Sequence, residues 1–485
     1  MSSPAVKNTA STSSITPIDA ISSSSSVECI SGELQQRLIV QYHYTQWPDM
    51  DIPVDAHPLI NLIKEVNEQN GKEDYPIVVH CSAGVGRTGT YITIDAMIDK
   101  IEKEGKIDIY NFVKRMRKER SLMVQTVRQY VFIYRAILEY YLFGYTKIEV
   151  NLFKQNLNYL KKLTDQKTER TLLQQEFNKL SLLPIEYTSH RDALLSCNVE
   201  KNRNSHFVPY DRNRVCLSRI LGHPYINASF IEGYVKECSF IITQDPLIDT
   251  IPEFWRLFIE HESNCIVQLH TSYTVEPSCP IYYPDELGVT MKIGSTTLIK
   301  LVHKEILESK MILREINLTD TREALAKTIY HFEYLIQITN NDNSQTCIPT
   351  TLNGINNLFD FIGQVRKQQR LCGEKYIIVH CGYGGPSTSL FCAAIILVDQ
   401  LKSEHAVDIF QTVRGLQRQR MNMITNVSQY EYLYDLILKF LEESFNRTLW
   451  TKSSLTNSTY DNNTQNDVQP LSISSSKINI NQDIY

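Results

Sequence analysis

Residues 80–89, HCSAGVGRTG, combine side chains that could transfer a phosphoryl group. Cys81 supplies a thiol, which becomes a strong nucleophile where a helix N-terminus and a nearby cation lower its pKa. Arg87 follows six residues later, and its planar guanidinium can bind two phosphoryl oxygens at once, which lysine cannot do. This pairing predicts attack by the Cys81 sulfur on a phosphate monoester.

The backbone of the same segment could form a cradle for the phosphate oxygens. Consecutive N–H groups can donate to an anion, and glycines permit the tight turn that this requires. Thr88 could hydrogen-bond the sulfur as it leaves in a second step. An inert buried cysteine beside a Gly-rich turn is the weaker alternative, because His, Cys, two Gly and Arg stand in register. The cradle residues are Ser82, Ala83, Gly84, Val85 and Gly86, and His80 supports them.

The elements that must position this loop can be predicted from apolar patterns. The apolar run 77–79 predicts a buried strand that ends at the loop, and residues 90–101 predict an amphipathic helix after it. Strand, loop and helix together present a helix N-terminus to an anion. A later helix has aromatic and aliphatic residues at helical spacing, which we expect to be core. They are Tyr130, Ile133, Tyr134, Ile137 and Tyr141.

The chain repeats itself once. The sequence YPIVVHC at 75–81 returns as KYIIVHC at 375–381, and residues 127–142 return in similar form at 427–442. Both pairs are offset by 300 residues, so the two copies keep the same internal spacing. Two copies indicate a duplicated domain and not a solenoid.

Composition excludes several function classes. The 485 residues are 42% hydrophobic and 21% charged, as in ordinary globular proteins, and the formal charge of −5 gives no general attraction to nucleic acid. The basic run at 115–120 is expected to be a solvated helix face. Eleven cysteines without metal-ligand spacing indicate reduced thiols, no bound metal and a cytoplasmic location. No apolar run reaches the length of about 18 residues that a membrane span requires.

Three motifs together resemble the Cys-dependent protein tyrosine phosphatases. HCSAGVGRTG is similar to their signature loop, TQWPDMDIP at 45–53 to their mobile acid loop, and VQTVRQY at 124–130 to their glutamine loop. The tandem arrangement is most similar to receptor-type members. The resemblance implies an α/β fold with a twisted mixed sheet flanked by helices, present as one partial and one complete copy. It also implies no cofactor, and phosphotyrosine-containing proteins as partners.

The resemblance assigns roles to residues that would carry little signal alone. Asp49 would protonate the departing tyrosine oxygen and then activate water. Gln125 and Gln129 would position that water.

By the same resemblance, the second copy has lost its catalytic residues. The signature there reads HCGYGGPSTS at 380–389, in which Cys381 remains, Ser387 stands at the arginine position, and Pro386 removes a backbone N–H. Gln345 stands where the acid would be. We therefore expect a folded pseudophosphatase in which Cys381 is an inert buried thiol, with a redox thiol as the alternative. Two further positions are altered, Asn204 at the substrate-stacking tyrosine and Thr425 at the first loop glutamine.

The predicted domain plan has five parts. They are a disordered Ser/Thr-rich tail at 1–32, a partial catalytic domain at 33–146, a linker at 147–165, a pseudophosphatase domain at 166–445 and a disordered polar tail at 446–485. The partial domain lacks a counterpart of the first half of the second copy. Its strand edge is therefore expected to be open and its stability marginal.

Three functions remain open on these grounds. An active phosphatase is the first, a non-catalytic scaffold is the second, and a redox-sensing thiol module that needs only Cys81 is the third. Contact between the two phosphatase domains and a longer membrane-anchored parent are further possibilities.

Overall fold

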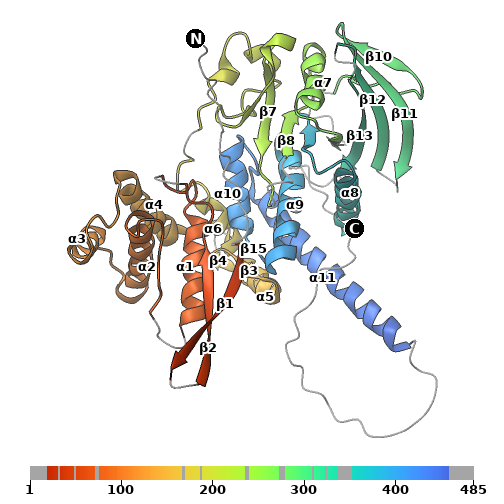
Figure 1. The fold of residues 1–485 in the computed structure, drawn as a ribbon. Coiled ribbons are helices and arrows are strands. Elements are labelled where there is room, and N and C mark those ends of the chain that lie inside the picture. Colours follow the sequence, from red (N-terminus) through yellow and green to blue (C-terminus); the bar gives the residue numbers. More distant parts are fainter. Residues whose placement is uncertain are drawn as a thin grey trace. The chain divides into compact units, whose positions relative to one another are not determined.

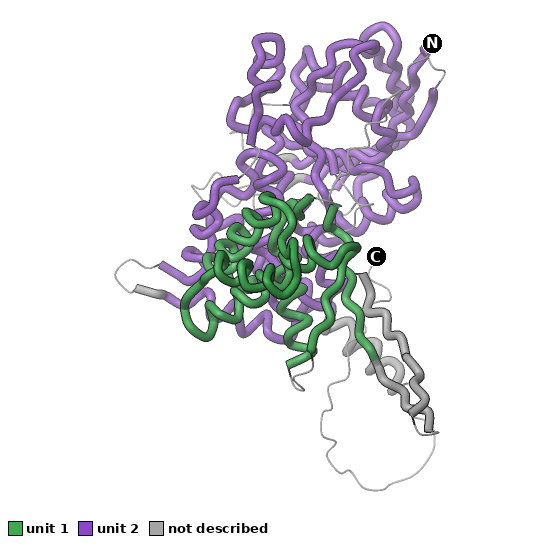
Figure 2. Tube along the Cα trace, turned by 60° about the vertical axis from the view of Figure 1, so that its left-hand side comes forward, with its two compact units in different colours: residues 1–146 green, residues 147–485 purple. Residues whose placement is uncertain are grey.

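The computed structural model divides the chain into two compact units, residues 1–146 (unit 1) and 147–485 (unit 2), shown in Figure 2. None of the helices that the structure describes is long and apolar enough to cross a membrane. The described residues are 19–30, 33–48, 51–71, 76–165, 170–185, 188–234, 240–271, 279–307, 311–322, 325–336 and 352–457.

Unit 2 is built on a nine-stranded mixed sheet (Figure 1). The central strand β14 (Ile377–Cys381) pairs in parallel with β8 (Phe240–Gln244) on one side and β9 (Cys265–Thr271) on the other. The remaining strands extend the sheet outward from these three. In order they are β13 (Leu325–Ile336), β12 (Met311–Asp320), β11 (Thr297–Leu307) and β10 (Thr290–Ile293) beyond β9, and β7 (Tyr225–Ile231) and β6 (Arg214–Cys216) beyond β8.

Helices bury this sheet on both faces, as parallel strands require. Helix α7 (Ile251–Glu260) contributes Trp255 to a core that includes Ile378 of β14. Ile377 and Val379 point the other way along the strand and are also fully buried. The other large helices are α8 (Leu352–Leu371), α9 (Pro386–Glu404), α10 (Ile409–Gln419) and α11 (Val427–Asn457). The predicted α/β fold with a mixed sheet is confirmed.

The segment 147–165, which we expected to be a linker, is a folded part of unit 2. It holds β3 (Ile148–Glu149), α5 (Val150–Leu160) and β4 (Leu163–Asp165). The reason is an amphipathic helix whose Phe153 and Leu157 are buried. After it come β5 (Arg170–Thr171) and α6 (Leu172–Lys179), while β15 (Ala406–Val407) pairs with β3.

Unit 1 is a small helical body with one hairpin. Its helices are α1 (His57–Asn70), α2 (Gly86–Glu104), α3 (Ile109–Glu119) and α4 (Val127–Phe143). They share a core that includes Trp47, Ile94 and Phe132. The hairpin pairs β1 (Asp19–Ile30) with β2 (Glu33–His43) in antiparallel register.

The structure differs from three further expectations. Residues 76–80 form no strand, and Ile77 and Val78 are exposed, with Val78 at 87%. The predicted strand was therefore wrong, because no strand in the described part of unit 1 pairs with these residues. Within the tail expected to be disordered, residues 19–30 form β1, while 1–18 lie outside the described residues. At the other end α11 continues to Asn457, and residues beyond 457 are not described.

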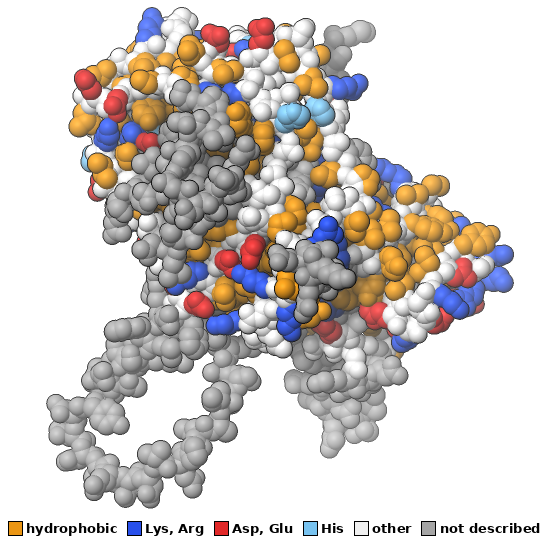
Figure 3. All heavy atoms as spheres, turned by 180° about the vertical axis from the view of Figure 1, so that it is seen from behind, with side chains coloured by type: hydrophobic (Ala, Val, Ile, Leu, Met, Phe, Trp, Pro, Cys, Tyr) orange, Lys and Arg blue, Asp and Glu red, His pale blue; other side chains and the backbone are white. Residues whose placement is uncertain are grey.

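Helix α4 of unit 1 has a second apolar face that points to solvent. Val127, Val131, Tyr134, Leu138 and Tyr141 are 44–79% exposed and follow one another at spacings of four and three residues. The opposite face, with Phe132 and Ile133, is buried in the core. Orange side chains gather on this unit at the right of Figure 3. The prediction that Tyr134 and Tyr141 belong to the core was wrong.

Candidate active site

Cys81 stands directly before the loop of residues 82–85, which leads into α2 at Gly86. The loop bends over residues 82–85, and Gly84 adopts a φ of +67°, which favours glycine. The N–H of Gly84 donates to the Cys81 sulfur at 3.2 Å. Cys81 is half-buried, so the sulfur is within reach of solvent and held by a donor.

This environment favours the thiolate form of Cys81. Burial raises the pKa of the thiol. Donors at Thr88 and the N–H groups of Gly84 and Val85 lower it by more, so the pKa falls to about 7. The donors belong to the start of α2, where unpaired N–H groups carry partial positive charge. Half of the Cys81 thiols would therefore be ionised near neutral pH.

The structure brings the two predicted glutamines against the signature loop. A Cβ added to Gly86 would lie 3.0 Å from Gln129 Nε2 and 3.2 Å from Gln125 Oε1. Gln129 is buried, and its Oε1 accepts hydrogen bonds from the N–H groups of Gln125 and Thr126 at 3.0 and 3.2 Å. The Thr126 side chain in turn accepts a hydrogen bond from the Gln129 N–H. This capping box fixes the start of α4 beside the signature loop.

Two arginines that sequence reasoning placed on a solvated face hold backbone near this site. Arg120 Nη2 donates to the carbonyl of Ala83 at 3.2 Å. Arg117 donates to the carbonyls of Met123 and Val124 at 2.8 and 2.6 Å, just before the glutamine loop. A usable signal existed for Arg120, because the duplicated segment has arginine at 420 as well.

The predicted acid Asp49 lies outside the described residues, but both flanks of its loop are described. Trp47 is buried against Phe132, with ring centroids 6.0 Å apart, and its Nε1 donates to the Asp51 carbonyl at 2.9 Å. The Asp51 carboxylate accepts from Arg128 at 2.9 Å. The acid loop is therefore attached at both ends to α4, the helix that carries the glutamines.

The other predicted loop residues lie where the loop opens to solvent. Ser82, Ala83 and His80 are exposed, whereas Gly86 and Thr88 are buried. Arg87 is half-buried in the first turn of α2.

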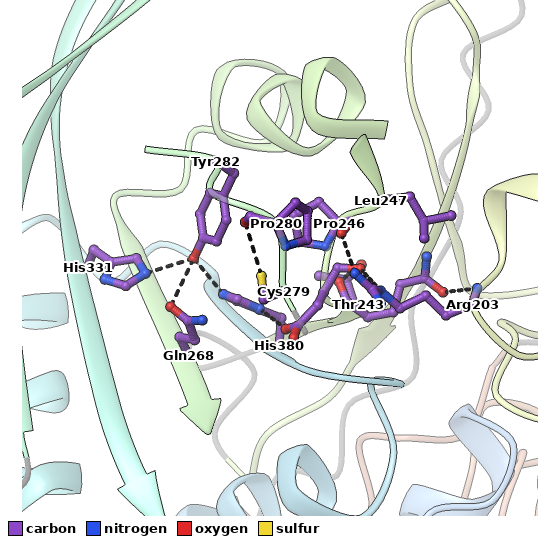
Figure 4. A network of polar contacts seen from close by, with 12 residues as sticks. Arg203, Thr243, Pro246, Leu247, Gln268, Cys279, Pro280, Tyr282, His331 and His380 are labelled. Carbon is purple, nitrogen blue, oxygen red and sulfur yellow. Dashed lines mark hydrogen bonds and ion pairs between the residues drawn. The ribbon is translucent and has the colours of Figure 1, made fainter. Parts of the chain in front are cut away.

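In unit 2 the counterpart of His80 is buried in a polar network, shown in Figure 4. His380 Nδ1 lies 2.6 Å from the Asp245 carboxylate, and its Nε2 lies 2.9 Å from the Tyr282 hydroxyl. That hydroxyl also lies 2.7 Å from His331 Nε2. Because an ionised carboxylate can only accept hydrogen bonds, His380 donates from Nδ1 to Asp245. Asp245 and Tyr282 come from the half of the fold that has no counterpart in the described residues of unit 1.

The second signature loop is closed by an aromatic ring. Phe207 stacks on Tyr383 with centroids 5.5 Å apart and planes 13° apart. A Cβ added to Gly385 would lie 2.6 Å from the Phe207 ring. Cys381 is completely buried at the end of β14. The Phe207 ring therefore packs directly against the loop at Gly385.

The substituted residues of the second site are satisfied without a ligand, with one exception. Pro386 opens α9, and Asn204 Oδ1 accepts from the N–H of His206 at 2.8 Å. Thr425 donates its N–H to Gln429 at 2.7 Å. Ser387 is buried, and among the described residues nothing hydrogen-bonds its hydroxyl. Gln345 lies outside the described residues.

No group of His, Cys, Asp or Glu side chains in the described parts of the chain could hold a metal ion.

Comparison with known proteins agrees with this geometry. The sequence profile of the family described as Protein-tyrosine phosphatase matches residues 6–139 and 198–439. The chain belongs to the protein tyrosine phosphatase family. The match begins at residue 6, before residue 33, where the sequence analysis places the start of the first domain.

The curated relatives that the chain matches are receptor-type. Receptor-type tyrosine-protein phosphatase alpha of Mus musculus is 38% identical over 412 residues, which cover 84% of this chain and 48% of that protein. The epsilon protein of Rattus norvegicus is 38% identical over 410 residues, covering 84% and 57%. The zeta protein of Rattus norvegicus is 33% identical over 416 residues, which cover 84% of this chain and 17% of that protein. The chain thus spans about half the length of the alpha and epsilon relatives, and the predicted receptor-type resemblance is confirmed.

Proposed function

We propose that unit 1 hydrolyses phosphotyrosine on proteins through a phosphocysteine intermediate at Cys81, and that unit 2 is a catalytically silent partner domain. The observation that carries the proposal is the Cys81 sulfur at the start of α2, held by the Gly84 N–H with a pKa of about 7. A thiol beside a Gly-rich loop, an arginine in the next helical turn and two glutamines against the loop fit this reaction.

In the first step the Cys81 thiolate attacks phosphorus. The S–P bond forms, the bond from phosphorus to the tyrosine oxygen breaks, and Asp49 gives its proton to that oxygen. Arg87 and the N–H groups of 82–87 bind the three equatorial oxygens, on which charge is spread in the transition state.

In the second step a water molecule replaces the thiolate. Gln125 and Gln129 orient the water, Asp49 takes its proton, the S–P bond breaks and inorganic phosphate leaves. The Thr88 hydroxyl bonds the sulfur as negative charge returns to it, consistent with its effect on the pKa of Cys81. The enzyme returns to its starting state without a cofactor.

Unit 2 is proposed to be silent because an aromatic ring packs against its signature loop and Ser387 stands at the arginine position of that loop. Phe207 covers Gly385, Cys381 is fully buried, and Ser387 offers no cation to a phosphate. We propose that it acts as a folded module, with Cys381 an inert thiol.

The scaffold function is the second candidate, and one observation favours it. Residues 76–80, which lead into Cys81, belong to no strand, and all of them except the half-buried Val79 are exposed. A loop without a strand behind it is held less firmly, so we expect unit 1 to turn over slowly.

The test is hydrolysis of para-nitrophenyl phosphate by the 485-residue chain. Cys81→Ser should reduce turnover to background, and Asp49→Ala should slow it by about 10². Cys381→Ser is the matched control in unit 2 and should leave the rate unchanged. Equal turnover by the parent chain and Cys81→Ser would exclude the mechanism and leave the scaffold function.

Substrate class needs a separate measurement. A phosphotyrosine peptide and the same peptide with phosphoserine should be compared at equal concentration. Release of phosphate from the phosphotyrosine peptide alone would support the proposal, whereas equal release from both would contradict it.

A further inference from the structure

Two cysteines of unit 2 meet where the chain returns from α8 to the central sheet. Cys265 is the first residue of β9, and Cys372 directly follows the last residue of α8. Residues 373–376 join Cys372 to β14, whose first residue, Ile377, is paired with Cys265. The register of the sheet therefore brings together two cysteines that are far apart in the chain.

The side chains of these two cysteines are in direct contact. The Cys265 thiol donates a hydrogen bond to the Cys372 sulfur, and Gln368 Nε2 donates a second one from 3.7 Å. The N–H of Cys372 donates to the carbonyls of Gln368 and Gln369, both at 3.1 Å, so the end of α8 fixes its backbone. Two sulfurs in contact can be joined by a small movement of their side chains.

The two thiols differ in exposure and in acidity. Cys372 is half-buried, whereas Cys265 is only 2% exposed. The hydrogen bonds from Cys265 and Gln368 lower the pKa of Cys372, although burial opposes them. The bond to Cys372 and burial both raise the pKa of Cys265 well above its usual range. Cys372 is therefore the thiol that an oxidant can reach in its ionised form, while Cys265 is shielded behind it.

A purely structural role explains these observations less well. Buried cysteines that serve only packing behave as small apolar side chains. Cys372 instead stands at a helix end, partly open to solvent, with two donors directed at its sulfur. These are the features of a reactive thiol, and the second thiol is already in contact with it.

We propose that Cys372 and Cys265 form a peroxide-sensitive dithiol, in which oxidation joins the end of α8 to the start of β9 through a reversible disulfide. Both thiols belong to unit 2, so this modification does not depend on hydrolysis by unit 1.

The oxidation takes place in two steps. In the first, the Cys372 thiolate attacks one oxygen of hydrogen peroxide. The S–O bond forms, the O–O bond breaks, and the hydroxide that leaves takes up a proton to become water. In the second, the Cys265 sulfur attacks the Cys372 sulfenic acid. The S–S bond forms, the S–O bond breaks, and the hydroxide that leaves takes the Cys265 proton. One peroxide is reduced for the two thiols that are oxidised.

Contact between the two sulfurs favours this intramolecular disulfide over a mixed disulfide with an external thiol. Because Cys265 already lies against Cys372, the second step does not wait for a collision with another molecule. Burial of Cys265 also keeps external thiols away from its sulfur.

The test is disulfide mapping of the 485-residue chain after treatment with graded hydrogen peroxide. Free thiols are blocked with N-ethylmaleimide under denaturing conditions, and the unreduced digest is read by mass spectrometry. We expect a pair of peptides joined through Cys265 and Cys372, which dithiothreitol separates. Cys372→Ser should abolish this pair and leave Cys265 alkylated. Cys197→Ser, at an exposed cysteine of the same unit, is the matched control and should leave the yield unchanged.

A second variant traps the intermediate of the reaction. Cys265→Ala leaves Cys372 without the second thiol, so dimedone labelling of its sulfenic acid should rise at least about tenfold over the parent chain. Circular dichroism confirms that the variants fold. Equal dimedone labelling in the parent chain and Cys265→Ala would overturn the proposal.

Two mapping results would also overturn it. One is that Cys265 and Cys372 both remain alkylated at peroxide concentrations that already oxidise the exposed Cys197. The other is a disulfide of Cys372 with a cysteine other than Cys265.

Discussion

The segment before each signature cysteine has almost the same sequence in both units, but it forms a buried strand in unit 2 and no strand in unit 1. Residues 377–381 form the central strand of unit 2, fully buried between β8 and β9. Residues 76–80 of unit 1 form no strand, and Val78 is 87% exposed. A strand needs lateral partners for its backbone groups, so a Val/Ile-rich run becomes a strand only where such partners are present.

The same contrast reaches the two sites. In unit 2 the signature loop follows the buried strand β14, and Ser387 stands where unit 1 has Arg87. Phe207 packs against this loop. Unit 1 has Cys81 and Arg87, but among its described residues no strand pairs with residues 76–80. On the proposed function we therefore expect slow turnover from unit 1 and none from unit 2.

The largest effect that would test this comparison is on stability. Val379→Asp should destabilise unit 2 by at least about 4 kcal/mol, because it buries an unpaired charge in the central strand. Val78→Asp at a solvent-exposed position should change unit 1 by less than about 0.5 kcal/mol. A thermal melt with limited proteolysis separates the two units. A large loss from Val78→Asp would show that residues 76–80 are buried in solution and would remove the contrast.

A second test uses the paired arginines. Arg420 is fully buried and donates to the Gly384 carbonyl at 2.8 Å and to Asn227 at 2.7 Å, so Arg420→Ala leaves buried acceptors unpaired. We expect a loss of about 3 kcal/mol in unit 2. Arg120→Ala removes one exposed bond to Ala83 and should cost under about 1 kcal/mol. Equal losses measured by chemical denaturation would contradict the difference in support.

A third test follows the ionisation of Cys81. Because its pKa is about 7, the thiolate fraction should rise tenfold per pH unit below pH 7 and level off above it. Iodoacetamide labelling, read by mass spectrometry of the peptide that contains Cys81, measures this profile. Cys381 is the internal control and should label only when unit 2 unfolds, since it is buried. A midpoint near 8.5, the value of an ordinary cysteine, would show that the loop does not stabilise the thiolate.

The smallest expected effect concerns the arginine position of the second signature loop and tests whether unit 2 is silent. Ser387→Arg restores the missing guanidinium, yet we expect no gain in para-nitrophenyl phosphate hydrolysis. Pro386 still lacks an N–H, Gln345 is no acid, and Phe207 still covers Gly385. The assay is done with Cys81→Ser in the background, so that only unit 2 can contribute. Turnover above that background would show that one cation is enough and that the loop opens.

The candidate site was predictable because its information is local. The thiol, the glycines and the arginine lie within ten residues, and the start of α2 at Gly86 depends on hydrogen bonds between near neighbours. Gln125 and Gln129 required the resemblance, since nothing in their own spacing shows that they meet Gly86. Arg120 was missed because its contact with Ala83 crosses 37 positions of the chain.

The sequence by itself determined the duplication, the family, and the residue types at Cys81, Arg87 and Ser387 on which the proposed function rests, because these depend on which residues stand where. Only the tertiary structure decided that residues 377–381 form a strand and 76–80 do not, and that Tyr434 is buried while Tyr134 is exposed. Helix hydrogen bonds close within the segment that forms them. Strand pairing and the cover of a helix face require segments distant in the chain, and the described residues of the two units differ in which of those segments pack there.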